Sequence, residues 1–284
     1  MNLCIDPTLP SLLEQLKGEV KNSGSYMKVR SMVATIVEKY GVHQSYELGS
    51  SLTWHRARIV DETLEGLWYQ DKYDLGARSE DSVSDYGRCH SPKASVAYLA
   101  LSEDIALSEV AAKSGSYVAI ATYTPIENFI VVPIGELDHY RRTGSTYLGM
   151  ANRHSSQPYV DAEKEDSDRW LMLSLADAFL ADVFSTSLSD KSQYLVTAAL
   201  ADYLFNSANW QRSIDGIIYP SVAYRSGLNL AIPSRILDKQ FSLSLLETKI
   251  IYLKSHFDYG IYEKQTVAKL KSVSIDGKLE WNDK

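Results

Sequence analysis

The spacing of apolar positions changes along this chain, and the changes predict where helices and strands lie. In residues 9–40 apolar side chains recur three and four positions apart, which predicts two helices, the second ended by Gly41. From about residue 50 short apolar runs alternate with turn residues. These runs predict strands at 95–101, 117–124 and 128–133.

The same pattern predicts further elements towards the C-terminus. Ser102 is placed to cap a helix at 103–113. Residues 136–168 are polar and irregular, and their acidic cluster at 161–168 is interpreted as a solvated loop or helix start. The later elements predicted are helices at 169–184 and 190–206, a short strand at 217–219, and closing strands or mixed elements at 241–253 and 258–274.

Helices and strands intermix without regular βαβ alternation, which favours an α+β fold. We expect a helical N-terminal extension at 1–48 and one larger domain at 49–284. No repeat or low-complexity segment separates the two.

Charge and cysteine content narrow the classes of partner. The chain has 29 Lys and Arg against 36 Asp and Glu, for a net charge of −7, whereas nucleic-acid binders usually carry a basic excess. We therefore expect no nucleic-acid partner and an anionic ligand held by a few placed cations. Cys4 and Cys89 form no disulfide framework, and the N-terminus lacks the basic and apolar regions of a secretion signal. No apolar stretch is long enough to span a membrane, so a cytoplasmic protein without a membrane partner is expected.

Familiar catalytic motifs are absent from the sequence. It contains no P-loop, GxGxxG, GxSxG or HExxH pattern, and its six histidines show no metal-ligand spacing. We expect neither a catalytic metal nor a bound cofactor.

Two arginine-bearing stretches are candidates for ligand binding. In Trp54–Arg58 (WHRAR), Arg56 and Arg58 would share one face of a strand, either exposed to solvent or aimed at a pyrophosphate. In Gly87–His90 (GRCH), Arg88 is either solvated or grips a ligand that Gly87 lets approach the backbone.

Four further candidates lie on predicted strands and a helix. Tyr98 lies mid-strand, where a core position is the simplest interpretation. Glu109 is on a helix that is apolar almost all round, so its carboxylate needs either an ion pair with a buried arginine or a function. Ser221 follows a buried strand in Asp215–Ser221 (DGIIYPS), and Asn229 ends the GLN stretch at 227–229.

Together these stretches resemble the RES family, named for its Arg, Glu and Ser. The segments that carry the resemblance stand in the family's order: WHRAR (54–58), GRCHSPKASVAYLA (87–100), IALSEV (105–110), DGIIYPS (215–221) and GLN (227–229). The resemblance covers about residues 50–235. Residues 1–48 and 136–168 are additions to the typical family member.

The resemblance implies an ADP-ribosyltransferase-like mixed-sheet core that degrades NAD by phosphorolysis or hydrolysis. NAD is then a substrate, with inorganic phosphate as the co-substrate of phosphorolysis. Carried over, the catalytic residues are Arg56, Arg88, Tyr98, Glu109 and Ser221, and the substrate-binding residues are Arg58 and Asn229.

The family's usual role is that of a toxin restrained by an antitoxin or immunity protein, which is therefore a possible partner. The sequence leaves open whether the chain forms a homo-oligomer. Two alternatives also stay open: a mono-ADP-ribosyltransferase that modifies a protein, and a non-catalytic nucleotide-binding module.

Overall fold

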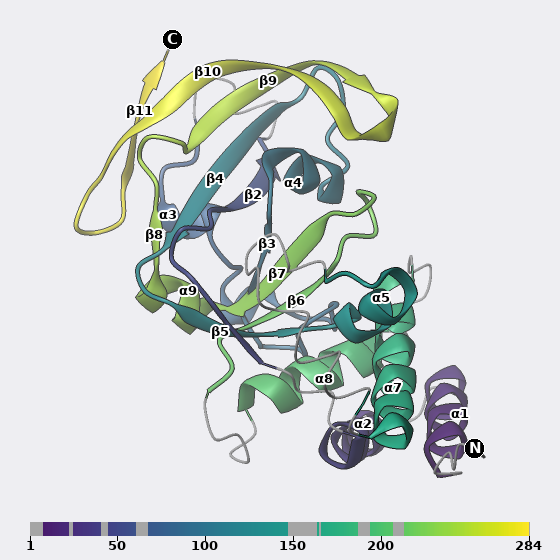
Figure 1. Cartoon of the computed structure of the whole chain (residues 1–284). Coiled ribbons are helices and arrows are strands. Elements are labelled where there is room, and N and C mark those ends of the chain that lie inside the picture. The colour runs from purple at the N-terminus through teal and green to yellow at the C-terminus, as the bar shows by residue number, and fades with distance from the viewer. Residues whose placement is uncertain are drawn as a thin grey trace. The chain divides into compact units, whose positions relative to one another are not determined.

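The computed structural model describes residues 8–22, 25–40, 45–60, 68–146, 164, 166–186, 194–206 and 213–283 (Figure 1). The chain divides into two compact units that alternate along the sequence. Over the described residues, unit 1 comprises Met1–Tyr46, Ser84–Pro92 and Ile130–Pro220, and unit 2 comprises Glu47–Val83, Lys93–Phe129 and Ser221–Lys284.

Unit 1 is mainly helical. Its elements are α1 (Thr8–Lys21), α2 (Tyr26–Tyr40), α5 (Glu136–Thr143), α7 (Ser167–Ser185), α8 (Tyr194–Asn206) and the strands β5 (Phe129–Pro133) and β6 (Gly216–Pro220). Strand β1 (Tyr46–Leu48) falls where the chain passes from unit 1 to unit 2.

The N-terminal helices bury the apolar stripes that predicted them. The side chains of Leu9, Leu13 and Leu16 are buried along α1, and those of Val33 and Ile36 along α2. Helix α2 packs on α8, where Arg30 forms an ion pair with Asp202 and the Tyr203 hydroxyl donates to Glu38 at 2.8 Å.

Strands β5 and β6 pair in parallel, with Val131 opposite Gly216. The buried Asp215 precedes β6, and its carboxylate accepts a hydrogen bond from the Ile130 N–H at 2.8 Å. Asp215 therefore joins the start of β6 to the neighbouring strand β5.

Helix α5 was not expected, because 136–168 reads as irregular sequence. Its N-terminal N–H groups are satisfied from another helix: the buried Asp177 of α7 accepts from Gly135 at 2.8 Å and from Asp138 at 3.0 Å. Gly135 has φ +82°, and a Cβ there would lie 2.8 Å from the Ala181 Cβ, so only glycine fits. Gly41 and most of the acidic cluster at 161–168 lie outside the described residues.

Unit 2 is built on an antiparallel sheet. Its strands are β2 (Trp54–Ile59), β3 (Val96–Ala100), β4 (Tyr117–Pro125), β7 (Leu228–Pro233), β8 (Phe241–Leu243), β9 (Lys249–Phe257), β10 (Ile261–Val273) and β11 (Leu279–Asp283). They run in the order β7-β3-β2-β4-β9-β10-β11, and β8 pairs with β4. The helices are α3 (Lys72–Leu75), α4 (Glu103–Glu109), α9 (Ser234–Gln240) and the 3₁₀ turns η2 (Glu80–Ser82) and η4 (Asp258–Gly260).

Helix α4 covers one face of this sheet (Figure 1). Its Ile105, Ala106 and Leu107 form a buried cluster with residues of β2, β4 and β9 that includes Ala57 and Ile120. Strands β3 and β4 bury apolar side chains and confirm the strands predicted at 95–101 and 117–124. The α+β class is also confirmed, with both antiparallel and parallel strand pairs present.

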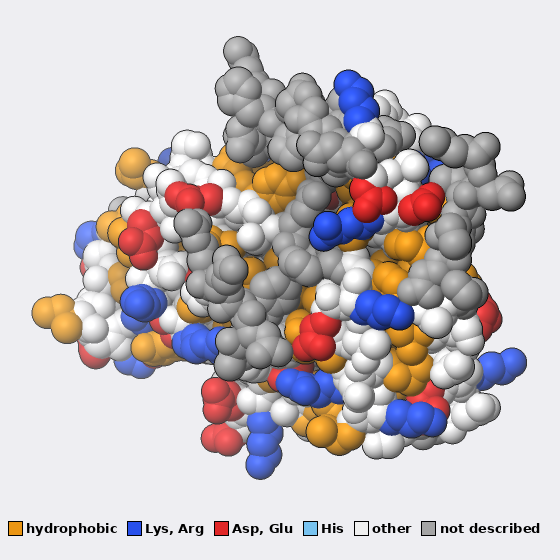
Figure 2. All heavy atoms as spheres, turned by 60° about the horizontal axis from the view of Figure 1, so that its bottom comes forward, with side chains coloured by type: hydrophobic (Ala, Val, Ile, Leu, Met, Phe, Trp, Pro, Cys, Tyr) orange, Lys and Arg blue, Asp and Glu red, His pale blue; other side chains and the backbone are white. Residues whose placement is uncertain are grey.

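Two observations concern the molecular surface. No helix of the described residues combines the length and apolar character that a membrane crossing requires. On the face shown in Figure 2, acidic and basic side chains are interspersed among the coloured residues and neither sign gathers into a continuous patch.

Asp177 should make stability depend on pH. Burial raises the pKa of its carboxyl from 3.8 to about 6. The folded protein then binds a proton that the unfolded chain releases, so the stability from this group is present below about pH 4 and lost as pH rises through about 6. We expect the free energy of unfolding of the wild type, relative to Asp177→Asn, to fall by about 3 kcal/mol across that range.

Denaturant titrations at pH 4 to 7 measure this difference. Asp182→Asn is the matched control, because Asp182 is an exposed aspartate of the same helix, and its profile should follow the wild type. Parallel profiles of the wild type and Asp177→Asn would contradict the prediction.

Candidate functional site

Glu109 lies in the last turn of α4, in unit 2. Ser102 caps the start of the helix as expected, since its Oγ accepts from the Ile105 N–H at 3.4 Å. The helix is shorter than predicted and ends at Glu109, because Ala111 adopts a left-handed φ of +49°. The N–H groups of Ala111 and Ala112 then bond back to Ser108 and Leu107, which is the Schellman arrangement.

A helix C-terminus carries partial negative charge, so this is an unfavourable end for a carboxylate. Two donors compensate: the Ser221 hydroxyl donates to Glu109 Oε1 at 2.5 Å, and the Asn229 Nδ2 donates to the same oxygen at 2.6 Å. The three side chains therefore form one cluster, in which a single oxygen of the carboxylate takes both hydrogen bonds.

Both donors are held by the backbone around them. The Ser221 N–H donates to the Gly227 carbonyl at 2.8 Å, and its Oγ accepts from the Tyr224 N–H at 2.9 Å, which leaves the hydroxyl proton for Glu109. Asn229 lies on β7 directly opposite Ala100 of β3, the strand that leads into α4. The position of the carboxylate is thus fixed by a loop, a strand and a helix end.

Two acceptor atoms of the cluster stay open. Among the described residues no hydrogen bond is made to Glu109 Oε2, and the Glu109 side chain is exposed. Asn229 is 3% exposed, and its Oδ1 is buried without a hydrogen-bond partner among the described residues. The site therefore offers a solvent-facing carboxylate oxygen next to a buried amide oxygen, both suited to hydroxyl groups or developing positive charge.

Part of the sequence interpretation of Glu109 was wrong. The side chain was expected against apolar surface, with an ion pair to a buried arginine as the structural explanation. It is exposed instead, and within the described part of the chain it has a hydroxyl and an amide as partners and no arginine. The hydroxyl proton of Ser221 is directed at Glu109.

Tyr98 lies on β3 opposite Ala231, on the same side of the strand as Ala100. Its side chain is half-buried, so its exposure fits neither a fully buried core residue nor a fully exposed one, and a contact with ligand stays open.

Arg56 and Arg58 share one face of β2, as the alternation predicted, but this face is turned away from α4. The register of β2 with β4 is continuous, and Ala57, between the two arginines, packs into the cluster beneath α4. The structure therefore does not bring the arginine pair to the face on which Glu109 lies.

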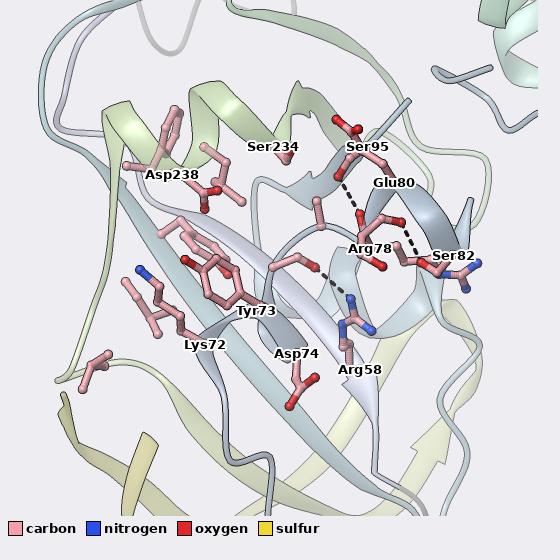
Figure 3. A pocket seen from close by; sticks show the side chains of 18 of the residues that line it. Arg58, Lys72, Tyr73, Asp74, Arg78, Glu80, Ser82, Ser95, Ser234 and Asp238 are labelled. Atoms are coloured by element: carbon pink, nitrogen blue, oxygen red, sulfur yellow. Dashed lines mark hydrogen bonds between the residues drawn. The ribbon is translucent and has the colours of Figure 1, made fainter. Parts of the chain in front are cut away.

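The arginine side of β2 borders a cavity of about 800 Å³ (Figure 3). Arg58 lines it and donates to the Gly76 carbonyl at 2.8 Å, while its Nε is buried without a partner in the described structure. Burial lowers the pKa of both Arg56, to about 10, and Arg58.

Arg88 belongs to unit 1, where it has a structural contact. Its guanidinium donates to the carbonyl of Phe184 near the end of α7 and lies 5.9 Å from the ring of Tyr194. Gly87 lies against a neighbour within its own turn, and a Cβ there would lie 2.1 Å from the His90 ring, so a larger residue would require that ring to shift.

Sequence reasoning missed the other polar residues of the cavity, among them Arg78, Tyr123 and Asp238. They come from a loop, a strand and a helix, and no spacing in the sequence links them. Within the described residues, no group of three or more His, Cys, Asp or Glu side chains is placed to hold a metal ion.

Comparison with known proteins adds a family match. A family model described as RES domain matches residues 53–242, about two thirds of the chain. No curated protein matches. A similar solved structure is the crystal structure of the M. tuberculosis MbcT–MbcA toxin–antitoxin complex, with 11% identity, covering 75% of this chain and 88% of that chain at a TM-score of 0.32.

Asn229→Asp tests the cluster. The change replaces the donating amide with a carboxylate of the same shape, so two negative charges would meet across the contact to Glu109. We expect the free energy of unfolding at pH 7 to fall by about 3 kcal/mol. It should recover as pH falls, because protonation of either carboxyl removes the repulsion in the folded state.

Denaturant titrations at pH 7 and pH 5 provide the measurement. Adding Glu109→Gln restores an amide–carboxylate contact, so the double variant should regain most of the lost stability. The cluster would be disproved as a coupled unit if the single variant were as stable as the wild type at pH 7, or if the second change brought no recovery.

Proposed function

Because this chain belongs to the RES domain family, we propose that it cleaves the bond between nicotinamide and ribose in NAD. The observation that carries the proposal is the Glu109 carboxylate, held through Oε1 by Ser221 and Asn229 with Oε2 left open. Cleavage of an N-glycosidic bond builds positive charge at the ribose C1′, and a fixed carboxylate oxygen stabilises that charge in the transition state.

The two bonded neighbours have distinct tasks in this mechanism. Ser221 and Asn229 hold the carboxylate before substrate arrives, so no reorganisation is required as charge develops. The buried Asn229 Oδ1 is a second acceptor, suited to a ribose hydroxyl. The C1′–N bond breaks as an acceptor oxygen bonds to C1′, and nicotinamide leaves as a neutral molecule, so no strong general acid is required.

The other residues predicted from the sequence contribute to the proposal to different extents. Tyr98, half-buried on β3, is proposed to pack against the ribose or nicotinamide ring. The family resemblance assigns Arg88 to the diphosphate, and Arg88→Lys tests this through NAD affinity, because lysine keeps the charge but loses the bidentate fork. Arg56 and Arg58 leave β2 on the face opposite α4, so we do not assign them to the reacting bond.

The acceptor decides the reaction class. Phosphate would give a phosphorylated ADP-ribose, water would give ADP-ribose, and a protein side chain would give a modified protein. Incubating the purified full chain with NAD, with and without inorganic phosphate, and identifying the products by mass spectrometry distinguishes the three. No loss of NAD under any of these conditions would leave a non-catalytic nucleotide-binding module.

Glu109→Gln should abolish NAD consumption. The change preserves size and both neighbours but removes the charge that stabilises C1′, so we expect the rate to fall by about 10²-fold or more. The rate of nicotinamide release measures it. Glu263→Gln, an exposed glutamate of β10 in the same unit, is the control and should keep wild-type turnover. Wild-type turnover in a folded Glu109→Gln protein would remove Glu109 from the mechanism.

We further propose that the enzyme acts as a toxin whose activity a partner protein restrains, since unregulated loss of NAD stops metabolism. An acidic or C-terminal carboxylate group on the partner would suit Arg88, which the family resemblance assigns to the diphosphate, by mimicking phosphate.

Expression in bacteria should therefore slow growth for the wild type and for Glu263→Gln but not for Glu109→Gln. Colony counts and intracellular NAD after induction measure the effect. Normal growth with a soluble wild-type protein that is fully active on NAD in vitro would contradict the toxin role.

A further inference from the structure

The cavity beside Arg58 lies apart from the Glu109 cluster. It is lined by residues of unit 2 alone, ten of which are labelled in Figure 3. It opens on the face of β2 that is turned away from α4. Its volume of about 800 Å³ is within the range of sites that bind nucleotide-sized molecules. NAD cleavage at Glu109 gives this cavity no role.

Three side chains that border the cavity have at least one donor group without an acceptor among the described residues. Arg58 uses one nitrogen for the Gly76 carbonyl and leaves its buried Nε unpaired. The guanidinium of Arg78 forms no hydrogen bond or ion pair within the described structure, and neither does the hydroxyl of Tyr123, a residue that is 6% exposed. Because buried donors are normally satisfied, the unpaired Arg58 Nε indicates an absent acceptor, and the exposed Arg78 and the Tyr123 hydroxyl border the same cavity.

Positive charge is concentrated behind these donors. Arg56 precedes Arg58 on the same face of β2, and its Nε and Nη1 are also buried without a hydrogen bond in the described residues. No described carboxylate forms an ion pair with either arginine. Burial and the charge of Arg58 lower the pKa of Arg56, and burial and the charge of Arg78 lower the pKa of Arg58, although the nearby Asp74 acts in the opposite direction. The lining also carries the carboxylates Asp74, Glu80 and Asp238, so the case for an anionic ligand rests on the buried guanidinium nitrogens that lack an acceptor and not on an excess of positive charge.

The rest of the lining differs from a simple anion site. Leu237 of α9 and Phe241 and Leu243 of β8 supply an apolar wall, and Asp238 adds an acceptor near Lys72. A bare anion would leave this wall in water and face a carboxylate. A molecule with an apolar ring system and hydroxyl or amino groups would use both.

We propose that this cavity binds a nucleoside diphosphate, or a larger molecule that contains one, at a site separate from Glu109. The diphosphate oxygens accept from Arg58, Arg78 and Tyr123, since guanidinium groups match phosphate in charge and in geometry. The nucleoside lies against the wall of Leu237, Phe241 and Leu243, with Asp238 accepting from its hydroxyl or amino groups.

Calorimetric titration of the full-length chain with ADP and with inorganic pyrophosphate tests the proposal. ADP should bind with one site per chain and more tightly than pyrophosphate, because only ADP contacts the apolar wall. Arg58→Gln and Arg78→Gln should each weaken ADP binding by about tenfold or more. Arg78 is exposed and its side chain has no described contact, so its variant should fold even if that of Arg58 does not.

Two controls make the outcome decisive. Lys254→Gln removes a positive charge from β9, outside the cavity, and should bind ADP as the wild type does. Glu109→Gln should also keep wild-type ADP affinity, whatever its effect on NAD, so failure of this site and failure of NAD cleavage are separable.

The proposal would be overturned if ADP did not bind at millimolar concentration, or if its affinity were unchanged in Arg78→Gln. Loss of ADP binding in Glu109→Gln would place ADP at the Glu109 cluster instead. Equal affinity for ADP and pyrophosphate would overturn the assignment of the nucleoside to the apolar wall.

Discussion

Side-chain alternation along β2 is the constraint on which the organisation of unit 2 depends. Each residue of this strand must point to one face of the sheet or the other, and the register with β4 is continuous through all six positions. Ala57 is committed to the core beneath α4, so Arg56 and Arg58 are committed to the opposite face. Glu109 therefore lies on one face of the sheet, and the buried arginines Arg56 and Arg58 lie on the other.

The electrostatics of the two faces differ accordingly. On the α4 face a negative group stands at the negative end of a helix and is stabilised by neutral donors. An arginine in the same place would neutralise the carboxylate and remove the field that a developing cation needs. On the other face the arginines keep unpaired donors beside a cavity. One face therefore presents a carboxylate that a developing cation would complement, and the other presents unpaired guanidinium donors that an anion would complement.

The sequence predicted the elements better than their ends. The helices of residues 9–40 and the strands at 95–101 and 117–124 follow from local periodicity, and the structure contains them. Helix α5 depends on Asp177, a residue 42 positions from Gly135, which no local pattern reveals. The early end of α4 depends on a left-handed alanine, a conformation that sequence assigns to glycine.

The candidate site was predicted as a set of residue types and not as an arrangement. Glu109, Ser221 and Asn229 were selected from the sequence, but their contacts join residues 112 and 120 positions apart. The strand alternation of Arg56 and Arg58 was also predictable. Which face they would occupy was not, because that depends on the packing of Ala57 beneath α4.

The shortness of α4 has an evolutionary consequence. The segment from the cap at Ser102 to Glu109 is closed at both ends, and each helical residue turns the next by about 100°. Substitutions within it change packing by small steps, whereas a single insertion or deletion would rotate the carboxylate away from Ser221 and Asn229 at once. The length of this segment is therefore a stricter requirement than the residue type at its exposed positions, and we expect changes of chain length to be tolerated only outside it.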